Sequence, residues 1–272
     1  MRPWLFAFGE LRVPSYWAFL MIGLMAAFYL AWREARRDGL DGNRFLDLCL
    51  LMLLTGILGA RLMHVLAEDN PLAPGEPILT YYLAHPLDIF KLWNGLAYYG
   101  ALLLSLPVAL WFTRRPGLGV GRTFDLIGVF MPLGLTFGRL GCLLAGCCHG
   151  TPSGAGWGVV FDDPASLARP LGVPLHPTQL YEAGVALLLF GLLWVQKRRW
   201  RRFEGQVFLS FLALYSSARF LLEFLRGDNR GAWFGGALSS SQVISIPLLL
   251  AALTGLVWLQ RRAARRARSA PG

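Results

Sequence analysis

Seven long apolar segments constrain the fold of this chain more than any other feature of its sequence. Each contains few charged residues, and they cover residues 16–32, 45–66, 96–112, 124–144, 181–195, 207–225 and 242–259. A helix needs roughly 20 mostly apolar residues to cross a membrane, so the short segments 96–112 and 181–195 must include flanking residues. No segment shows the alternating pattern of an outer-membrane β-strand. The sequence predicts an all-α membrane protein with seven transmembrane helices in a single domain, residues 1–272.

The distribution of basic residues predicts the orientation of these helices. The chain has a net charge of +10, and most of its 26 Lys and Arg residues follow the first, third, fifth or seventh apolar segment. Because positive charge is retained on the cytoplasmic side of a membrane, we expect the N-terminus outside and the C-terminus in the cytoplasm. The basic tail, residues 261–272, is then expected to bind anionic lipid headgroups rather than nucleic acid. Because the basic residues follow the first segment, it is not expected to be a cleaved signal peptide.

Among the charged residues within the apolar segments or at their edges, three arginines and one glutamate lie toward the outer ends of the predicted helices, namely Arg61, Arg139, Arg219 and Glu223. A charge near the bilayer centre costs about 2.5–3.5 kcal/mol on insertion scales, which snorkelling and internal pairing reduce. In ARFLLEFLRG, Arg226 follows Arg219 and Glu223 at spacings that place all three on one helical face. With Arg139, this cluster has a surplus of positive charge. Guanidinium groups bind phosphate oxygens in pairs, so the sequence predicts a site for a lipid phosphate.

Polar residues and cysteines also gather near the long connections 67–95, 146–180 and 227–241, which are expected to lie outside and to contain functional residues. In HPTQLYE, residues 176–182, we expect His176, Gln179 and Glu182 to form a structural hydrogen-bond network. In GCLLAGCCHG, residues 141–150, the cysteines form a C-x4-C-C-H pattern. Structural zinc sites have two paired halves, and one is missing here. The sequence therefore favours small-residue packing and predicts no metal, with a Cys142–Cys147 disulfide as an alternative.

Taken together, the motifs RVPSYWAFLMIG, GARLMHVL, WNGLAYYG, GRLGCLLAG, HPTQLYE and RFLLEFLRG resemble the prolipoprotein diacylglyceryl transferase family over residues 10–262. The resemblance implies seven spans in a bacterial plasma (inner) membrane, with the N-terminus outside. It also implies that the diacylglyceryl group of phosphatidylglycerol is transferred to the thiol of a lipobox cysteine in a prolipoprotein signal peptide, and that glycerol phosphate is released. The expected partners are phosphatidylglycerol, prolipoproteins and membrane lipids, and no cofactor is implied.

The resemblance also implies roles for individual residues. Arg139 matches the arginine of the family's G-R-x-G motif, and both it and Arg219 would hold the phosphate as catalytic residues. The remaining candidates would bind substrate around them, and they are Glu223, Arg226, Tyr16 and Arg61.

The sequence departs from the family pattern at several positions. Cys142, Ala145 and Cys147 replace two asparagines and a glutamate of the family signature, and Tyr99 in YYGAL replaces a histidine. Tyr99 is a catalytic candidate in that place, although its reference pKa of about 10 makes it a weak base. Cys147 is a candidate covalent relay, and His149 is a candidate base. These departures leave two alternatives open: a related transferase with another acceptor, and a phospholipid-binding membrane protein without catalytic activity.

Overall fold

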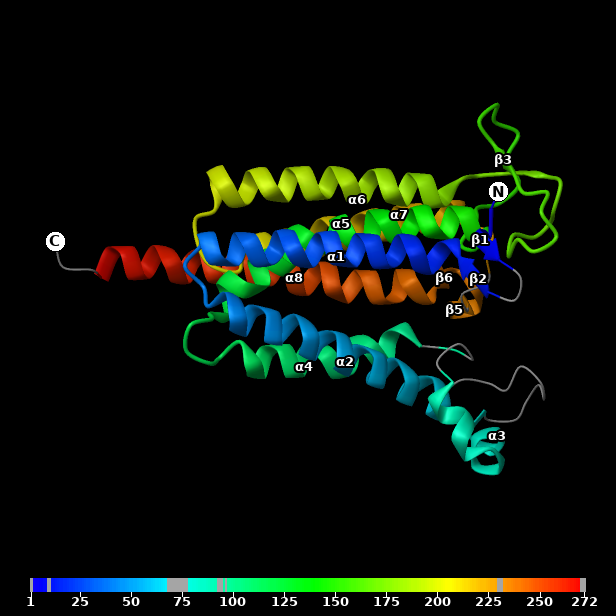
Figure 1. Cartoon of the computed structure of the whole chain (residues 1–272). Helices are drawn as coiled ribbons and strands as arrows, with labels where there is room; N and C mark the ends of the chain where they lie inside the picture. The colour runs from blue at the N-terminus through cyan, green and yellow to red at the C-terminus, as the bar shows by residue number, and fades with distance from the viewer. Residues whose placement is uncertain are drawn as a thin grey trace. The chain divides into compact units, whose positions relative to one another are not determined.

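Helices make up most of the computed structural model, which describes residues 2–8, 11–67, 78–91, 95, 97–228 and 232–269 (Figure 1). In chain order the elements are β1 Trp4–Phe8, β2 Leu11–Pro14, α1 Ser15–Arg37, α2 Gly42–Ala67, α3 Ile78–Ala84, η1 Pro86–Phe90, α4 Tyr98–Phe112, α5 Val120–Ala145, β3 Val159–Val160, β4 Pro174–Leu175, α6 Thr178–Val195, η3 Gln196–Trp200, α7 Gln206–Leu222, η4 Glu223–Leu225, β5 Ala232–Trp233, η5 Phe234–Gly236, β6 Leu238–Ser239 and α8 Ser240–Ser269. The strands form three short antiparallel pairs, β1 with β2, β3 with β4, and β5 with β6.

Six helices in the described part of the chain are long and apolar enough to cross a membrane. This finding confirms the prediction of a helical membrane protein. The segment 181–195 gains flanking residues as expected, because its helix begins at Thr178 and continues to Trp200. The segment 96–112 forms α4, which has only 15 residues. The seventh span therefore stays a prediction.

The chain divides into two compact units. The first contains Met1–Glu34 and Phe124–Gly272, and the second contains Ala35–Thr123. In the first unit, helices α1, α5, α6, α7 and α8 run side by side, with the strand pairs at one end and the last turns of α8 at the other (Figure 1). The second unit is built on α2 and α4. These two helices approach closely where a β-carbon on Gly59 or Gly100 would collide with the carbonyl oxygen of the other.

Two buried carboxylates stabilise the first unit at the end away from its strand pairs. Asp125, fully buried on α5, accepts hydrogen bonds of 2.8–3.1 Å from the main-chain N–H groups of Gly205, Val207 and Phe208. The first N–H groups of a helix have no partner within it, so this carboxylate caps α7. Glu34 near the end of α1 lies 2.8 Å from Lys197 and 2.8 Å from Arg198. These contacts connect α1 to η3, and α5 to the start of α7.

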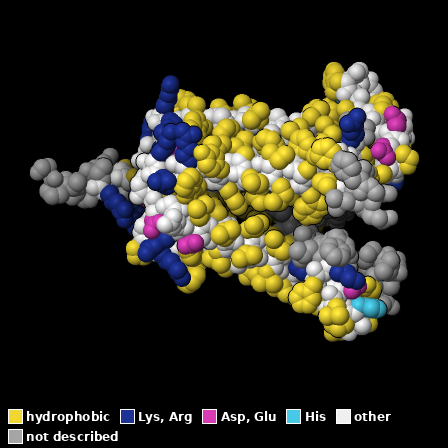
Figure 2. Space-filling view, viewed as in Figure 1, with side chains coloured by type: hydrophobic (Ala, Val, Ile, Leu, Met, Phe, Trp, Pro, Cys, Tyr) yellow, Lys and Arg dark blue, Asp and Glu magenta, His cyan; other side chains and the backbone are white. Residues whose placement is uncertain are grey.

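The sides of the first unit are apolar. Figure 2 shows hydrophobic side chains over most of the lateral surface of its helices, with Lys and Arg gathered near the end where α8 finishes. Met25 on α1 and Leu221 on α7 are 66% and 64% exposed. A water-soluble protein rarely exposes such continuous apolar surface, so these faces fit contact with lipid tails.

Candidate active site

Three guanidinium groups of the first unit converge on the carboxylate of Glu182. Arg139 on α5 lies 2.7 Å from Glu182 Oε2, and Arg219 on α7 lies 3.4 Å from Oε1. Arg226, which follows α7, lies 2.5 Å from the same Oε1. All four side chains are largely buried. The structure thus brings together Arg139, Arg219 and Arg226, which the sequence placed in one site, and it adds Glu182 at their centre.

Two further carboxylates balance the charge of this cluster. Glu223 Oε2 lies 2.5 Å from Arg219 Nη2, a short ionic contact that is not aligned as a hydrogen bond. Asp228 accepts two hydrogen bonds of 2.8 Å from Arg226. Arg139, Arg219 and Arg226 are therefore matched by Glu182, Glu223 and Asp228. The predicted surplus of positive charge is wrong for the described residues, because the prediction left out Glu182 and Asp228.

The position of Arg226 results from the way α7 ends. The helix ends at Leu222, and Arg226 follows the short η4 turn in an extended conformation, so it does not continue the face of α7. Its main chain forms an antiparallel bridge with Gly150. A β-carbon at Gly150 would lie 2.5 Å from His176 Cβ and 2.6 Å from Leu225 O. Glycine at this crossing lets the two segments approach closely enough to direct Arg226 toward Glu182.

Arg226 stays charged in this buried place. Burial alone would lower its pKa, but the hydrogen bond to Asp228 and the negative charges around it outweigh burial and raise the pKa of Arg226 above its usual value.

A small cavity opens beside the cluster. The space between its walls, with the open solvent at its mouth, is about 280 Å³, and its polar wall is formed by Arg139, Glu182, Tyr215 and Arg219. The remaining wall is apolar and consists of Leu135, Val185, Ala186, Ala218 and Leu222. Arg139 makes a single ion pair within the described residues, so its other N–H groups are available to a ligand in this cavity. As it stands, the cavity has room for about one water molecule, so its walls must move apart before a phosphate can enter beside the arginines. The acyl chains need the apolar lateral surface.

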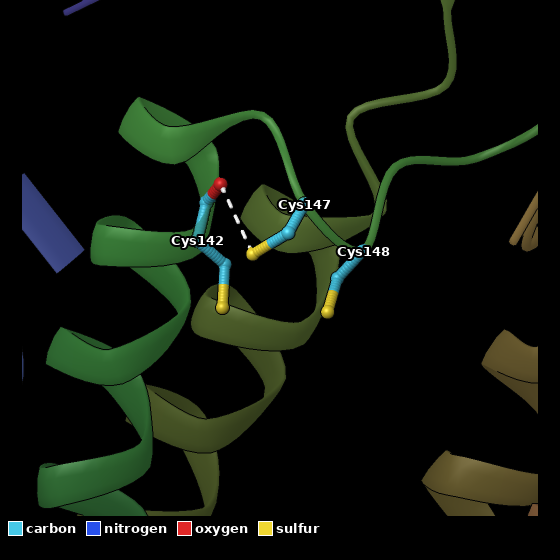
Figure 3. Close-up of side chains that lie close together, drawn as sticks. All are labelled: Cys142, Cys147 and Cys148. Carbon is cyan, nitrogen blue, oxygen red and sulfur yellow. Dashed lines mark hydrogen bonds between the residues drawn. The ribbon is translucent and has the colours of Figure 1, made fainter. Parts of the chain in front are cut away.

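The loop that follows α5 is held by the HPTQLYE segment. Thr178 Oγ1 donates a 2.7 Å hydrogen bond to Cys148 O, and Gln179 Nε2 donates a 2.8 Å bond to Cys147 O. Cys142 lies in the last turns of α5, and Cys147 and Cys148 lie on this loop close beside it (Figure 3). None of the four cysteines of the chain, all of them described, forms a disulfide.

The prediction that His176, Gln179 and Glu182 of HPTQLYE share one hydrogen-bond network is wrong. The three residues contact different partners: Gln179 binds the cysteine loop, Glu182 binds the arginines, and His176 Nδ1 lies 3.4 Å from the Tyr181 hydroxyl. The reason is their placement at the start of α6. There Gln179 is fully buried against the loop, while Glu182, three residues later, is in contact with α5 and α7.

The thiols of Cys142, Cys147 and Cys148 act on one another. Hydrogen bonds from the Cys142 and Cys147 thiols, together with the positive charges of Arg139 and Arg226, lower the pKa of the Cys148 thiol. Hydrogen bonds with Cys142 and Cys148, together with burial, raise the pKa of the Cys147 thiol. The relay role of Cys147 stays a prediction.

His149 is engaged by the main chain at both ring nitrogens. Nδ1 lies 3.0 Å from Gly150 O, and Nε2 lies 3.3 Å from the N–H of Arg169. This pattern assigns the proton to Nδ1 and makes Nε2 an acceptor. A role as a base, which stays a prediction, would require the bond from Arg169 to break.

Tyr16 lies in the first turn of α1, beside the end of α5. A β-carbon on Gly141 would lie 3.0 Å from Tyr16 O, so the glycine permits this contact, and the phenol interacts electrostatically with Arg139. The role of Tyr16 in substrate binding stays a prediction.

Arg61 and Tyr99 belong to the second unit. Arg61 is buried, and its guanidinium donates four hydrogen bonds of 2.7–3.0 Å. The acceptors are the carbonyl oxygens of Asp88, Ile89 and Gly95 and the hydroxyl of Tyr82. Tyr99 lies in the first turn of α4, and its side chain is outside the described part of the chain. The substrate role of Arg61 and the catalytic role of Tyr99 stay predictions.

Comparison with known proteins agrees with these features. The family model for prolipoprotein diacylglyceryl transferase matches residues 3–258. The chain is 38% identical over 259 residues to the phosphatidylglycerol–prolipoprotein diacylglyceryl transferase of Bordetella avium, which covers 92% of each chain. It is 33% identical to the enzyme of that name from Geobacter sulfurreducens, over 96% of each chain. It is 31% identical to the one from Clostridium tetani, over 90% of this chain and 93% of the relative.

Proposed function

Because the chain belongs to the prolipoprotein diacylglyceryl transferase family, we propose that it transfers the diacylglyceryl group of phosphatidylglycerol to the thiol of a lipobox cysteine in a prolipoprotein. In this reaction the thiol loses its proton, and its sulfur forms a bond to the glycerol carbon of the lipid. The bond between that carbon and the phosphate oxygen breaks, and the electron pair leaves with glycerol phosphate. The products are a thioether and a phosphate that has gained one negative charge.

The convergence of Arg139 and Arg219 on one cavity supports this function. The departing phosphate must be stabilised as its charge grows, and fixed donors in a site with little water do this most effectively. Arg139 contributes available N–H groups, and Arg219 lies on the same polar wall. We assign both as the catalytic phosphate-binding residues. Glu223 then keeps Arg219 in place, Arg226 keeps Glu182 in place, and Tyr16 contacts the headgroup.

Glu182 occupies the place that a phosphate oxygen would take. Three like charges this close repel each other strongly, and Glu182 separates them when no lipid is bound. We assign Glu182 as a positioning residue. When phosphatidylglycerol enters, its phosphate shares Arg139 and Arg219 with Glu182. The ion pair with Arg226 holds the Glu182 carboxylate in place against repulsion by the phosphate.

The finer topology belongs to the same proposal. We assign α4 as the seventh span, together with residues that precede it, because its 15 residues give a helix of only about 22 Å. We place the N-terminus outside and the C-terminus in the cytoplasm of a bacterial plasma membrane. The concentration of basic residues after alternate segments supports this orientation. The two units then form one membrane domain, as the family match across both of them supports.

A transfer assay tests the proposed function. Purified protein in detergent receives phosphatidylglycerol and a lipobox peptide, and mass analysis follows the peptide while glycerol phosphate is measured in solution. We expect the peptide to gain one diacylglyceryl group for each glycerol phosphate released. A peptide with serine in place of the cysteine is the control and should gain nothing. Release of glycerol phosphate without modification of the cysteine peptide would favour another acceptor, and binding without release would contradict the enzyme function.

The same assay tests the arginine assignment. Arg139→Ala and Arg219→Ala should each abolish transfer while the protein still inserts into the membrane. Arg198→Ala is the matched control, because Arg198 also pairs with a buried glutamate but lies at the other end of the unit. Turnover at the normal rate in either cluster variant would refute the assignment.

A further inference from the structure

Three cysteine sulfurs lie together at the end of α5, next to the arginine cluster. The Sγ atoms of Cys142, Cys147 and Cys148 are all within 4.8 Å of one another. Figure 3 shows Cys142 on the helix and the other two on the loop that leaves it, with the three sulfurs turned toward one region. The spacing in the sequence did not predict this arrangement, since adjacent cysteines in an ordinary backbone point apart.

The backbone of the loop explains how two adjacent thiols reach the same region. Gly146 has a φ of 81°, and Cys148 has a φ of 63°, the one positive value among the described non-glycine residues. A left-handed conformation costs a residue with a side chain roughly 1–2 kcal/mol. Hydrogen bonds from Thr178 and Gln179 to the carbonyls of Cys148 and Cys147 hold the loop in this conformation. The three thiols are therefore positioned by the surrounding structure and not by a flexible loop.

The arrangement suits a metal that prefers sulfur. Zinc binds thiolates at about 2.3 Å in a tetrahedral geometry, which puts pairs of ligand sulfurs about 3.8 Å apart. Sulfurs that already lie within 4.8 Å reach this spacing by small side-chain rotations. Cys147 and Cys148 are only half-buried, so an ion can enter. Three protein ligands leave a fourth position open, as in catalytic zinc sites.

We propose that Cys142, Cys147 and Cys148 bind one thiophilic divalent cation, Zn²⁺ by its chemistry, and that the open fourth position receives the thiol of the acceptor cysteine. This inference rests on the proposed function, and it replaces the expectation that the chain holds no metal. A thiol that binds such an ion loses its proton outright. The proton passes to solvent, and the bound thiolate then forms the S–C bond while the C–O bond to the phosphate breaks.

The location of the site agrees with this role. Gln179 on α6 binds Cys147 O at 2.8 Å, and Glu182, three residues later on α6, lies 2.7 Å from Arg139, so the thiol site and the phosphate site are neighbours. The chain has Tyr99 where the family pattern has a histidine, and its His149 is engaged at both nitrogens. A metal that deprotonates the acceptor thiol removes the need for a strong base at either position.

Cobalt titration tests the ligand set. Reduced, metal-stripped, full-length protein in detergent is titrated with Co²⁺, whose bonds to thiolates give an intense ultraviolet charge-transfer band. We expect saturation at one ion per chain. Cys142→Ser, Cys147→Ser and Cys148→Ser should each weaken binding by at least about tenfold, whereas Cys49→Ser, the control in α2, should not change it. Unchanged binding in the three variants would overturn the site.

A measurement on the unmodified protein covers the case in which a variant does not fold. X-ray absorption of the zinc-loaded protein should show three sulfur neighbours at about 2.3 Å. Zinc surrounded only by oxygen and nitrogen would overturn the proposal. A disulfide among the three cysteines, found after alkylation of the protein in intact membranes, would overturn it as well.

The lipobox peptide tests the open position. Adding it to the cobalt-loaded protein should intensify the charge-transfer band by one further thiolate, and the serine peptide should leave the band unchanged. No change with either peptide would overturn the acceptor role. Full transfer by chelator-treated protein would also overturn it while leaving the proposed function intact. A peptide-dependent band without transfer would contradict the proposed function and leave the metal site standing.

Discussion

Replacing Glu182 by glutamine tests the charge balance of the arginine cluster. The carboxylate lies 2.5, 2.7 and 3.4 Å from the three guanidinium groups. At a charge separation of about 4 Å and an effective dielectric constant of about 20, each pair attracts by about 4 kcal/mol. Desolvation offsets much of this attraction, and removing one partner of a buried ion pair typically costs about 3–5 kcal/mol. We expect Glu182→Gln to lower the free energy of unfolding by that amount.

The lipid response separates this reasoning from a general loss of packing. The variant leaves a surplus positive charge in the cluster, which an anionic phosphate can neutralise. Phosphatidylglycerol should therefore raise the melting temperature of Glu182→Gln more than that of the unmodified protein. Diacylglycerol, which lacks the phosphate, should raise neither. The assay is thermal unfolding in detergent with each lipid added.

Glu34→Gln is the matched control. Glu34 is equally buried and pairs with Lys197 and Arg198, but at the other end of the unit. It should lose stability and keep transfer activity as long as it is folded. A Glu182→Gln protein that melts like the unmodified one, or that gains no more from phosphatidylglycerol, would refute the reasoning.

Other variants test phosphate binding, the cap of α7 and the contact between Gly141 and Tyr16. Arg139→Lys and Arg219→Lys should each lower glycerol phosphate release by about 100-fold or more, because an ammonium cannot donate the paired N–H bonds of a guanidinium; release within twofold of normal would count against phosphate binding. Asp125→Ala should lower the free energy of unfolding by about 1–3 kcal/mol or more, because three main-chain N–H groups lose their acceptor; an unchanged thermal melt would contradict the cap. Gly141→Val should impair folding by collision with Tyr16, whereas Gly184→Ala, where nothing lies within 4 Å, should be tolerated; size-exclusion profiles compare the two.

Much of the fold could be predicted from the sequence because the membrane imposes length and composition on its helices. For this reason the segment 124–144 lies within α5, and the segment 207–225 overlaps α7, which ends at Leu222. The ends were less predictable. Arg226 was expected on the face of α7, but α7 ends at Leu222 and a bridge to Gly150 redirects the chain. Such a turn depends on a partner 76 residues away in sequence, which local spacing does not show.

The candidate site shows the same division. Arg139 and Arg219 could be identified because a charge within a membrane span is costly and is usually paired or functional. Glu182 was visible in HPTQLYE, but its part in the arginine cluster depends on how α6 packs against α5 and α7. Asp228 follows the last apolar residues of α7 and gave no signal in the sequence. The gathering of the three cysteines depends on the left-handed conformation at Cys148, which is rare for such a residue and not predictable from its neighbours.

A structure of the protein with phosphatidylglycerol bound would show whether Arg139 and Arg219 hold the lipid phosphate. The lipid phosphate should lie in the cavity beside Glu182, within hydrogen-bonding distance of both Arg139 and Arg219, with the acyl chains against the apolar lateral surface. A phosphate bound elsewhere, with the contacts of Arg139 and Arg219 to Glu182 unchanged and the cavity empty, would contradict this assignment.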